Sequence, residues 1–266
     1  MNRTFLALLQ FDGRGYSGWQ RQAVGRTVQG EVERVLARLA DAPVTAHAAG
    51  RTDAGVHAEA MGVSFTLPER WSSHQLRRAL NALLPPDCWT ASVHEMHAGF
   101  HARKSALSRR YRYVIGTDDA AASPFRRPFE WALGRGLRWD LLVDCARLLP
   151  GEHDFQAFSV RGQPHAHHRC TILLSEWRLR TGDRGVEFHV QADRFLHHMV
   201  RMLVGTMVEV ALERRPPDDF ARLLVTEDNQ ETSPPAPAEG LYFVRAEYPA
   251  SAFVDEAAAS GATIHA

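Results

Sequence analysis

The chain has 266 residues, 45% of them hydrophobic, and its 31 basic side chains balance 31 acidic ones. Such values fit a globular protein with a substantial core and exclude a wholly basic nucleic-acid binder, although they permit a local basic groove. The three cysteines are widely spaced, no apolar run reaches the roughly 20 residues of a membrane span, and no signal-peptide pattern opens the sequence. We therefore expect a cytoplasmic protein without membrane contact, made of one large or two ordinary domains.

The first part of the chain predicts strands and helices in alternation. Hydrophobic residues recur there at strand or helical spacing, and Asp12-Gly13 and Pro85-Pro86 interrupt them. In chain order, the predicted elements are a strand over Thr4–Phe11, a helix capped by Thr27 with Val28, Val32, Val35, Leu36 and Leu39 on one stripe, a strand through Met61, Val63 and Phe65, a helix through Leu76, Ala79, Leu80 and Leu83, and a strand from Trp89 to Met96.

The second part of the chain returns to a similar order. Two segments without periodicity, 116–129 and 228–240, contain proline and polar residues and predict surface loops. The predicted elements are a helix near Asp140–Leu149, strands near Thr171–Arg180 and Val186–Ala192, a long helix over about Leu196–Glu213, a short helix from near Pro217, and a strand over Leu241–Tyr248.

Two halves with a β-α-β-β-α-β-like order predict the α+β class, with antiparallel or mixed sheets and helices on one face. The expected divisions are an N-terminal half over 1–115, a connecting segment over 116–138, a C-terminal half over 139–250 and a frayed tail over 251–266.

One short segment, Gly50–Ala58, places Asp53 after an arginine and before Gly55, at the head of an alternating segment. Glycines allow positive φ and close approach of another backbone, so the segment predicts a tight loop that holds a ligand against Asp53. An exposed Asx turn, in which the aspartate bonds only its own backbone, is the alternative.

Basic residues cluster with aromatic residues in two places. Segment 101–112 has five arginines and lysines and no acid, and it contains Tyr111; segment 13–26 has three arginines interleaved with Tyr16 and Trp19. Because arginine and lysine bind phosphates and aromatic rings stack on bases, both clusters fit RNA. A strand edge that its arginines protect from aggregation is the alternative.

Histidines raise the question of a metal site. His165, His167, His168 and Cys170 lie in a loop without the paired spacing of a zinc site. Adjacent histidines on a helix, such as His197-His198, point about 100° apart and seldom bind one ion. We therefore expect no metal, and His197 or His198 either bonds within a site or caps the helix.

Arg201 follows on the same predicted helix, near the edge of its apolar stripe. A partly desolvated guanidinium needs a carboxylate partner, and Asp53 is the candidate that the sequence offers. The alternative is an arginine whose charged end reaches solvent.

Seven segments, in order from Phe11 to Tyr242, resemble the TruA family of tRNA pseudouridine synthases. They are Phe11-Asp12-Gly13 with Tyr16-Ser17-Gly18-Trp19-Gln20-Arg21-Gln22, Gly50-Arg51-Thr52-Asp53-Ala54-Gly55-Val56-His57, Phe100-His101-Ala102-Arg103, Arg109-Arg110-Tyr111-Arg112-Tyr113, Gly151-Glu152-His153-Asp154-Phe155, Phe195-Leu196-His197-His198-Met199-Val200-Arg201, and Glu239-Gly240-Leu241-Tyr242.

The resemblance implies two ferredoxin-like halves whose sheets merge into one mixed, mostly antiparallel sheet with a central cleft. It implies a homodimer that binds tRNA, and an isomerase that converts uridine to pseudouridine at positions 38, 39 and 40 of the anticodon arm without metal or organic cofactor.

The resemblance also implies roles for residues. Asp53 is the catalytic carboxylate, either a nucleophile at the sugar or base or a base at C2′. Arg201 is its ion-pair partner, Tyr111 stacks on the target uracil and helps to move the C5 proton, and Arg51 fills the gap left by the flipped nucleotide. The remaining residues that we expect to contact RNA are His57, Arg103, Arg109, Arg110, His198 and Arg21.

Two other functions are compatible with parts of the sequence. A non-catalytic RNA-binding protein would share the basic and aromatic clusters but would not need Asp53 in so specific a loop. A nucleoside glycosidase would need a second acidic residue, for which Glu59 and Asp12 are the nearby candidates. The segment 159–169 is richer in histidine than the family pattern, which puts RNA contacts there in doubt.

Overall fold

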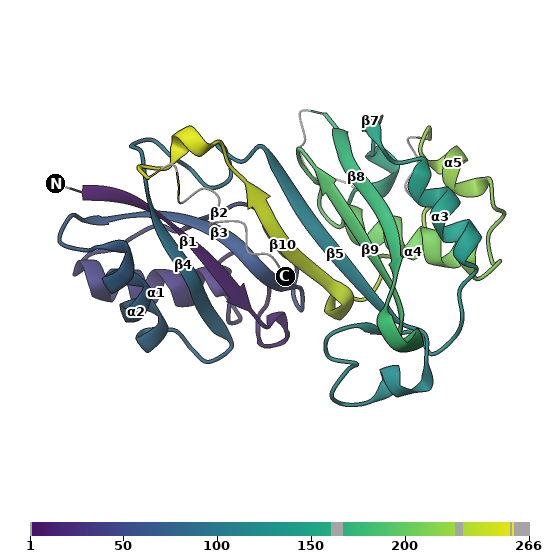
Figure 1. The fold of residues 1–266 in the computed structure, drawn as a ribbon, viewed down its shortest axis with the longest axis horizontal. Helices are drawn as coiled ribbons and strands as arrows, with labels where there is room; N and C mark the ends of the chain where they lie inside the picture. The colour runs from purple at the N-terminus through teal and green to yellow at the C-terminus, as the bar shows by residue number, and fades with distance from the viewer. Residues whose placement is uncertain (1, 161–166, 227–230, 256, 258–266) are drawn as a thin grey trace. The chain divides into compact units, whose positions relative to one another are not determined.

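The computed structural model describes residues 2–160, 167–226, 231–255 and 257. These residues form five α-helices and ten strands, and they divide into two compact units, 1–109 with 242–266 and 110–241 (Figure 1). Within the described ranges, none of the helices has both the length and the apolar content that a membrane crossing requires.

Unit 1 is built on an antiparallel sheet in which β1 lies between β4 and β3. The short β2 pairs with the second half of β3, and β10 pairs in parallel with its beginning. The elements of this unit are β1 (Asn2–Phe11), α1 (Val28–Ala40), β2 (His47–Ala48), β3 (His57–Pro68), α2 (Ser73–Leu83), β4 (Cys88–Met96) and β10 (Leu241–Glu247). Its first six elements have the β-α-β-β-α-β order that the sequence predicts.

The two helices of unit 1 begin at side-chain caps. Thr27 accepts a hydrogen bond from the amide of Gly30 at the start of α1, which confirms the predicted N-cap. Ser72 and Gln75 form a capping box at the start of α2. Each helix buries one apolar stripe, and α2 packs against β4.

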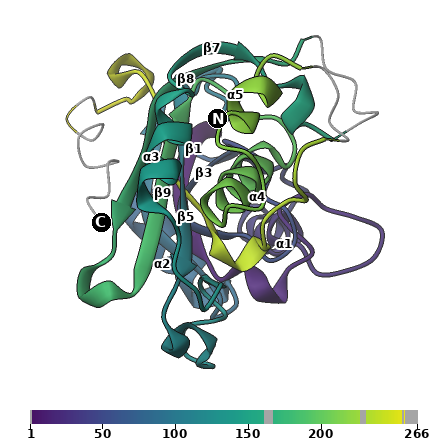
Figure 2. The same ribbon diagram turned by 90° about the vertical axis from the view of Figure 1, so that its right-hand side faces the viewer.

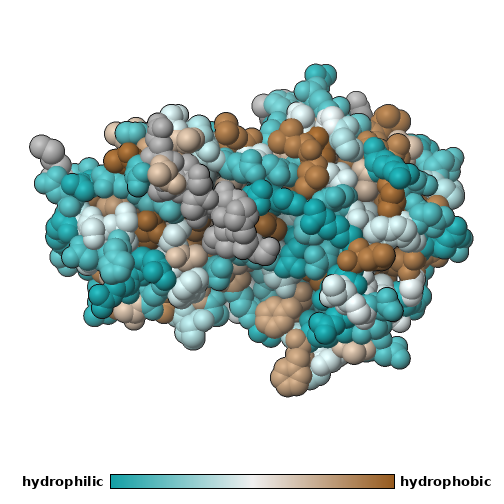
Figure 3. All heavy atoms as spheres, viewed as in Figure 1, coloured by the Kyte–Doolittle hydropathy of each residue, from teal (hydrophilic) through white to brown (hydrophobic). Residues whose placement is uncertain are grey.

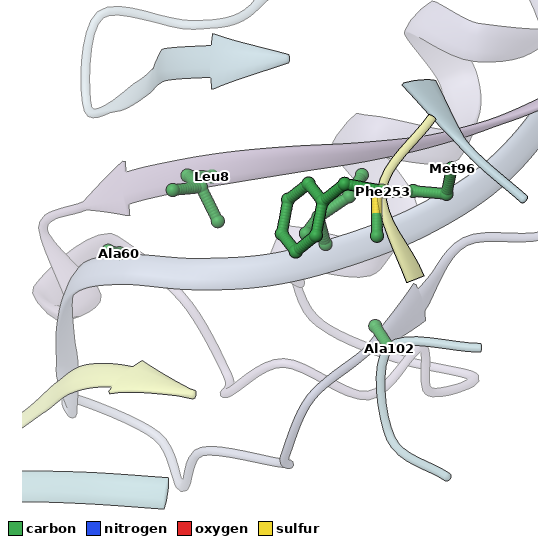
Figure 4. Close-up of a cluster of buried hydrophobic side chains, with 6 residues drawn as sticks. Leu8, Ala60, Met96, Ala102 and Phe253 are labelled. Atoms are coloured by element: carbon green, nitrogen blue, oxygen red, sulfur yellow. The ribbon is translucent and has the colours of Figure 1, made fainter. Parts of the chain in front are cut away.

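A hydrophobic cluster lies in unit 1 where the segment after β10 returns to the sheet. Figure 4 shows Phe253 beside Leu8 and Met96, with Ala60 and Ala102 nearby, and all five are buried. Phe253 belongs to the segment for which the sequence predicts a frayed tail, and most of the rest of that segment lies outside the described residues.

Unit 2 contains a second set of strands with its own helices (Figure 2). β8 pairs antiparallel with β7 and β9, and β6 pairs in parallel with the end of β5. The elements are β5 (Ser108–Gly116), β6 (Trp131–Ala132), α3 (Trp139–Arg147), β7 (Gly151–Asp154), β8 (Arg169–Leu179), β9 (Gly185–Ala192), α4 (Met199–Ala211) and α5 (Asp219–Leu223).

α4 begins later than its hydrophobic periodicity predicts. Its first residue is Met199, and His198 has a left-handed backbone with φ 63°, so Leu196 and His197 precede the helix. A left-handed residue cannot continue a right-handed helix, which is why the helix does not extend back to Leu196. The predicted apolar stripe of this helix is confirmed, because all of its members are buried: Met199, Val200, Leu203, Val204, Met207, Val208 and Ala211.

β5 is the main strand that the pattern of hydrophobic residues misses. Arg110 and Arg112 alternate with buried Tyr111 and Tyr113, and the high density of arginine conceals the strand spacing. The predicted α+β class and mixed, mostly antiparallel pairing are confirmed. The division into units falls within β5 and β10, whereas the sequence places its boundaries after residues 115 and 250.

The surface seen in Figure 3 is largely hydrophilic, with hydrophobic residues in separate patches. Exposed apolar side chains that are scattered in this way are normal for a folded domain.

Candidate functional site

Asp53 lies in the loop between β2 and β3, in a tight turn. The amide of Val56 donates to the carbonyl of Asp53 at 3.2 Å, and Gly55 has a φ of 82° inside the turn. That positive φ explains the glycine, since side chains disfavour this conformation. Thr52 and Val56 are buried on either side, while Asp53 itself is partly exposed. The turn therefore fixes the backbone and leaves the carboxylate accessible.

A second loop of unit 1, residues 12–19, supports the Asp53 turn; we call it the glycine loop. The amide of Trp19 donates to the carbonyl of Thr52 at 3.0 Å, and the amide of Gly13 donates to Nδ1 of His57 at 3.2 Å. Trp19 is itself buried. Hydrogen bonds from the glycine loop thus reach both sides of Asp53.

Two glycines of this loop touch the backbone of the Asp53 turn. A Cβ at Gly13 would clash with the carbonyl of Val56. A Cβ at Gly18, whose φ is 89°, would lie 2.6 Å from the carbonyl oxygen of Thr52. No side chain fits at either place without movement of one of the two loops. The spacing of Asp12-Gly13 and Gly18-Trp19 is therefore explained by close backbone packing.

His57 is 2% exposed and supports the same loops. Its ring stacks on Tyr242 with centroids 4.8 Å apart. Because Nδ1 accepts the amide of Gly13, the hydrogen-bond pattern assigns the proton to Nε2. His57 therefore supports the two loops of unit 1, and its contact with RNA stays a prediction.

Asp12 lies at the start of the glycine loop. Burial disfavours its charged form, but hydrogen bonds and charge from Arg14 outweigh burial and lower the pKa of Asp12. A carboxylate that is held ionised in this way is unsuited to act as the general acid of a glycosidase. The glycosidase alternative therefore loses one of its two candidate residues.

Arg26 anchors the chain that follows the glycine loop. Its guanidinium binds Asp87 with an Nη1–Oδ2 distance of 2.6 Å and lies over the ring of Tyr16, whose hydroxyl donates to Asp87 at 2.7 Å. The Arg26 hydrogen bond lowers the pKa of Asp87. The sequence assigns Arg26 and Tyr16 to an RNA-binding cluster, whereas the structure pairs them internally.

In the basic segment after β4, some cationic side chains are exposed and another binds backbone carbonyls. Arg103 and Lys104 are exposed. Arg109 donates to the carbonyls of Ala49, Ala106 and Arg103, the first at 3.2 Å. It thereby holds the basic segment against the residues that follow β2 and lead to Asp53.

The two remaining arginines predicted for RNA in unit 1 are exposed. Arg51 lies two residues before Asp53. Arg21 pairs with Glu33 at 3.2 Å on α1, and its side chain is 70% exposed.

Unit 2 carries the other predicted site residues, and we describe it separately. Tyr111 is 8% exposed on β5 and packs edge-to-face on Phe195 with centroids 5.0 Å apart. Arg110 precedes it and is partly buried. Arg112 pairs with Glu187 at 3.1 Å. Along β5, the buried ring of Tyr111 thus alternates with Arg110 and Arg112, which are only partly buried.

Arg201 lies in the first turn of α4, among buried residues. Its Nε donates to the carbonyl of Ala236 at 2.7 Å, and its own carbonyl accepts from the amide of Ala236 at 2.9 Å. The rings of His197 and His198 lie just before the helix with centroids 4.0 Å apart. These contacts fix the beginning of α4 to the segment before β10.

Part of the histidine-rich loop is described. His165 lies outside the described residues, and His167 lies 3.4 Å from the guanidinium of Arg194. Burial raises the pKa of the Cys170 thiol to about 12.

Comparisons with known proteins identify the family. A sequence model of the tRNA pseudouridine synthase family matches residues 7–103 and 145–249. The chain is 38% identical to the protein named tRNA pseudouridine synthase A of Moorella thermoacetica, over 90% of this chain and 97% of that protein. It is also 38% identical to the proteins of that name from Geobacillus kaustophilus, over 93% and 95%, and Thermus thermophilus, over 93% and 97%.

The match extends over most of the chain, and it includes the Asp53 turn, the glycine loop and the beginning of α4. This chain therefore belongs to the tRNA pseudouridine synthase family of isomerases.

Proposed function

We propose that the protein converts uridine to pseudouridine at positions 38, 39 and 40 of the tRNA anticodon stem-loop, with Asp53 as its catalytic carboxylate and no cofactor. Family membership supports the isomerisation itself. One observation favours Asp53: its carboxylate is partly exposed on a turn whose neighbours, Thr52 and Val56, are buried and bonded. A fixed backbone below an accessible carboxylate is what positioned catalysis requires.

The reaction breaks the bond between N1 of uracil and C1′ of ribose, turns the base and joins C5 to C1′. C5 then loses its proton and N1 gains one, so atoms and charge balance. Asp53 acts as the nucleophile at the sugar or base, or as the base that removes a proton from C2′. Each route uses an ionised carboxylate held against the flipped nucleotide.

The other proposed roles follow the family resemblance. Tyr111 stacks on the target uracil and moves the C5 proton, Arg201 supplies the cation that keeps Asp53 ionised, and Arg51 occupies the space that the flipped nucleotide leaves. Flipping a base out of its stack costs a few kcal/mol, so a side chain that fills the gap contributes to binding. We further propose a homodimer that works in the cytoplasm.

The decisive experiment compares Asp53→Asn with the wild-type protein on unmodified tRNA transcripts. We expect pseudouridine formation to fall by about 10³-fold or more, because the amide has no ionised oxygen, while tRNA affinity stays within about twofold. Asp41→Asn is the matched control, since Asp41 is an exposed aspartate of the same unit.

Appreciable turnover by Asp53→Asn would remove this residue from the chemistry. Transcripts with cytidine at position 38, 39 or 40 test the proposed sites, and product outside these positions would contradict the anticodon assignment.

A further inference from the structure

Unit 1 has a surface pocket of about 290 Å³ beside β2 and the second half of β3. Its wall includes the hydroxyl-bearing residues Thr4, Thr45 and Thr66, the ring of Phe100 and the imidazole of His47. Hydroxyl groups beside aromatic rings fit a ligand that has both hydrogen-bonding groups and a flat face. No residue of this pocket is among those to which we assign a role in the reaction.

A second imidazole lies against the pocket wall. The rings of His47 and His101 stack with centroids 4.4 Å apart and 27° between their planes. Nδ1 of His101 accepts the amide of Arg103 at 3.1 Å, which assigns the proton of the neutral ring to Nε2. The imidazole pair therefore offers a donor as well as a stacking surface.

The charges around this pair are basic. Burial lowers the pKa of His101, and the positive charges of Lys104 and Arg103 lower it further. Arg103 and Lys104 are exposed. Cationic groups that lie close enough to disfavour a positive charge on His101 also stabilise an anion that binds beside them.

The segment that carries these groups is held firmly. Ala102 is fully buried, its amide donates to Oγ of Ser64 at 2.9 Å, and its carbonyl accepts from the hydroxyl of Tyr248 at 3.0 Å. Arg109 adds its hydrogen bond to the carbonyl of Ala49. Because these bonds order the segment before any ligand arrives, binding there loses less entropy.

We propose that this pocket binds one nucleotide of the substrate RNA, separate from the uridine that reacts. The base and ribose enter beside His47, Phe100 and the threonine hydroxyls, and the phosphate lies on the basic groups of residues 101–104. Base stacking and phosphate neutralisation are the usual sources of affinity for unpaired nucleotides, and hydroxyl contacts suit the ribose 2′-OH.

The inference rests on the proposed function, because it takes RNA as the substrate. His47 is six residues before Asp53, which is at most about 20 Å of extended chain. One RNA strand can therefore contact both places.

The test measures the affinity of a tRNA transcript and the single-turnover rate of pseudouridine formation at saturating protein. Thr45→Trp fills the pocket without changing charge, and His47→Ala removes the stacked ring; both positions are exposed. We expect the dissociation constant to rise about 5- to 20-fold in each variant, as for the loss of one stacked base, with the saturated rate within about twofold.

Two variants at other exposed positions serve as controls. His74→Ala on α2 and Thr181→Trp in unit 2 repeat the same chemical changes away from the pocket and should bind as the wild type does. Thermal unfolding verifies that every variant is folded.

The outcomes separate the two proposals. If the wild type forms pseudouridine while Thr45→Trp and His47→Ala both bind tRNA with unchanged affinity, the nucleotide subsite is refuted and the proposed function stands. If both variants bind weakly but the wild type forms no pseudouridine, the subsite stands and the proposed function fails.

Discussion

Tyr111 and Tyr113, two residues apart on β5, have different surroundings. Tyr113 is fully buried, and its hydroxyl donates to the carbonyl of Pro237 at 2.7 Å. Burial, with a contribution from the negative charge of Glu239, raises the pKa of Tyr113. Tyr111 retains some exposed surface and packs against Phe195. The structure thus suits Tyr113 to stability, whereas Tyr111 is the tyrosine for which we propose a role in the reaction.

Phenylalanine at each position separates the two roles. Tyr113→Phe should lower the free energy of unfolding by about 1–2 kcal/mol, because the buried carbonyl of Pro237 loses its donor, and it should leave kcat unchanged. Tyr111→Phe should keep the stability and lower kcat by about 10-fold or more, if its phenol moves the C5 proton. Denaturant unfolding measures the free energy of unfolding of each variant, and a pseudouridine assay measures its kcat. Wild-type turnover by Tyr111→Phe would exclude the proton-transfer role.

Arginines that look equivalent in the sequence have different tasks in the structure. The guanidinium of Arg109 donates to backbone carbonyls, and that of Arg26 binds Asp87. The side chain of Arg103, in contrast, is exposed. The sequence predicts the basic clusters as a property of composition. It does not show which members are used internally, because their partners lie far away along the chain.

At the scale of elements, the glycine loop and the Asp53 turn act as one assembly. They are separated by more than thirty residues, yet Trp19 and Gly13 donate hydrogen bonds to the two sides of the turn. Gly18 allows the close approach of the two backbones. The position of the Asp53 carboxylate therefore depends on a loop that lies more than thirty residues away in the sequence.

Alanine at Gly18 tests this dependence against alanine at Gly99. Both glycines have a positive φ, 89° and 86°, but only at Gly18 does the added Cβ meet backbone, whereas at Gly99 nothing lies within 4 Å. Both variants should lose about 1 kcal/mol or more of stability from strain. Only Gly18→Ala should also lower kcat, by about 10- to 100-fold, because the turn must shift. Equal kcat values for the two folded variants would contradict the coupling of the loops.

At the scale of the whole molecule, unit 1 is assembled from both ends of the chain. β10 pairs with β3 through Tyr242 and Phe243, and Phe253 completes the cluster around Met96. Tyr248 is partly buried and packs against Phe100, and Gly62 leaves room for its hydroxyl. The fold of the N-terminal part thus depends on residues that lie more than 130 positions further along the chain.

Truncation after Leu241 should therefore unfold unit 1. It removes the buried rings of Phe243 and Phe253, each of which contributes about 1.5–3 kcal/mol, and the partly buried ring of Tyr248. Their sum is a large part of the stability of a typical domain. Truncation after Ala257 is the control and should have little effect. Circular dichroism and thermal unfolding compare the two proteins, and cooperative unfolding of unit 1 after the longer truncation would refute this dependence.

The sequence by itself determined the α+β class, the apolar stripes of α1 and α4, the Thr27 cap and the family, because periodicity, capping and short motifs are local properties. Tertiary structure decided that β5 is a strand despite its arginines and that α4 starts after the left-handed His198. It also decided that β10 completes unit 1 and that the glycine loop fixes the Asp53 turn. The physical reason is that these features depend on backbone contacts and burial between residues far apart in sequence, and such contacts outweigh local preferences of a few tenths of a kcal/mol per residue.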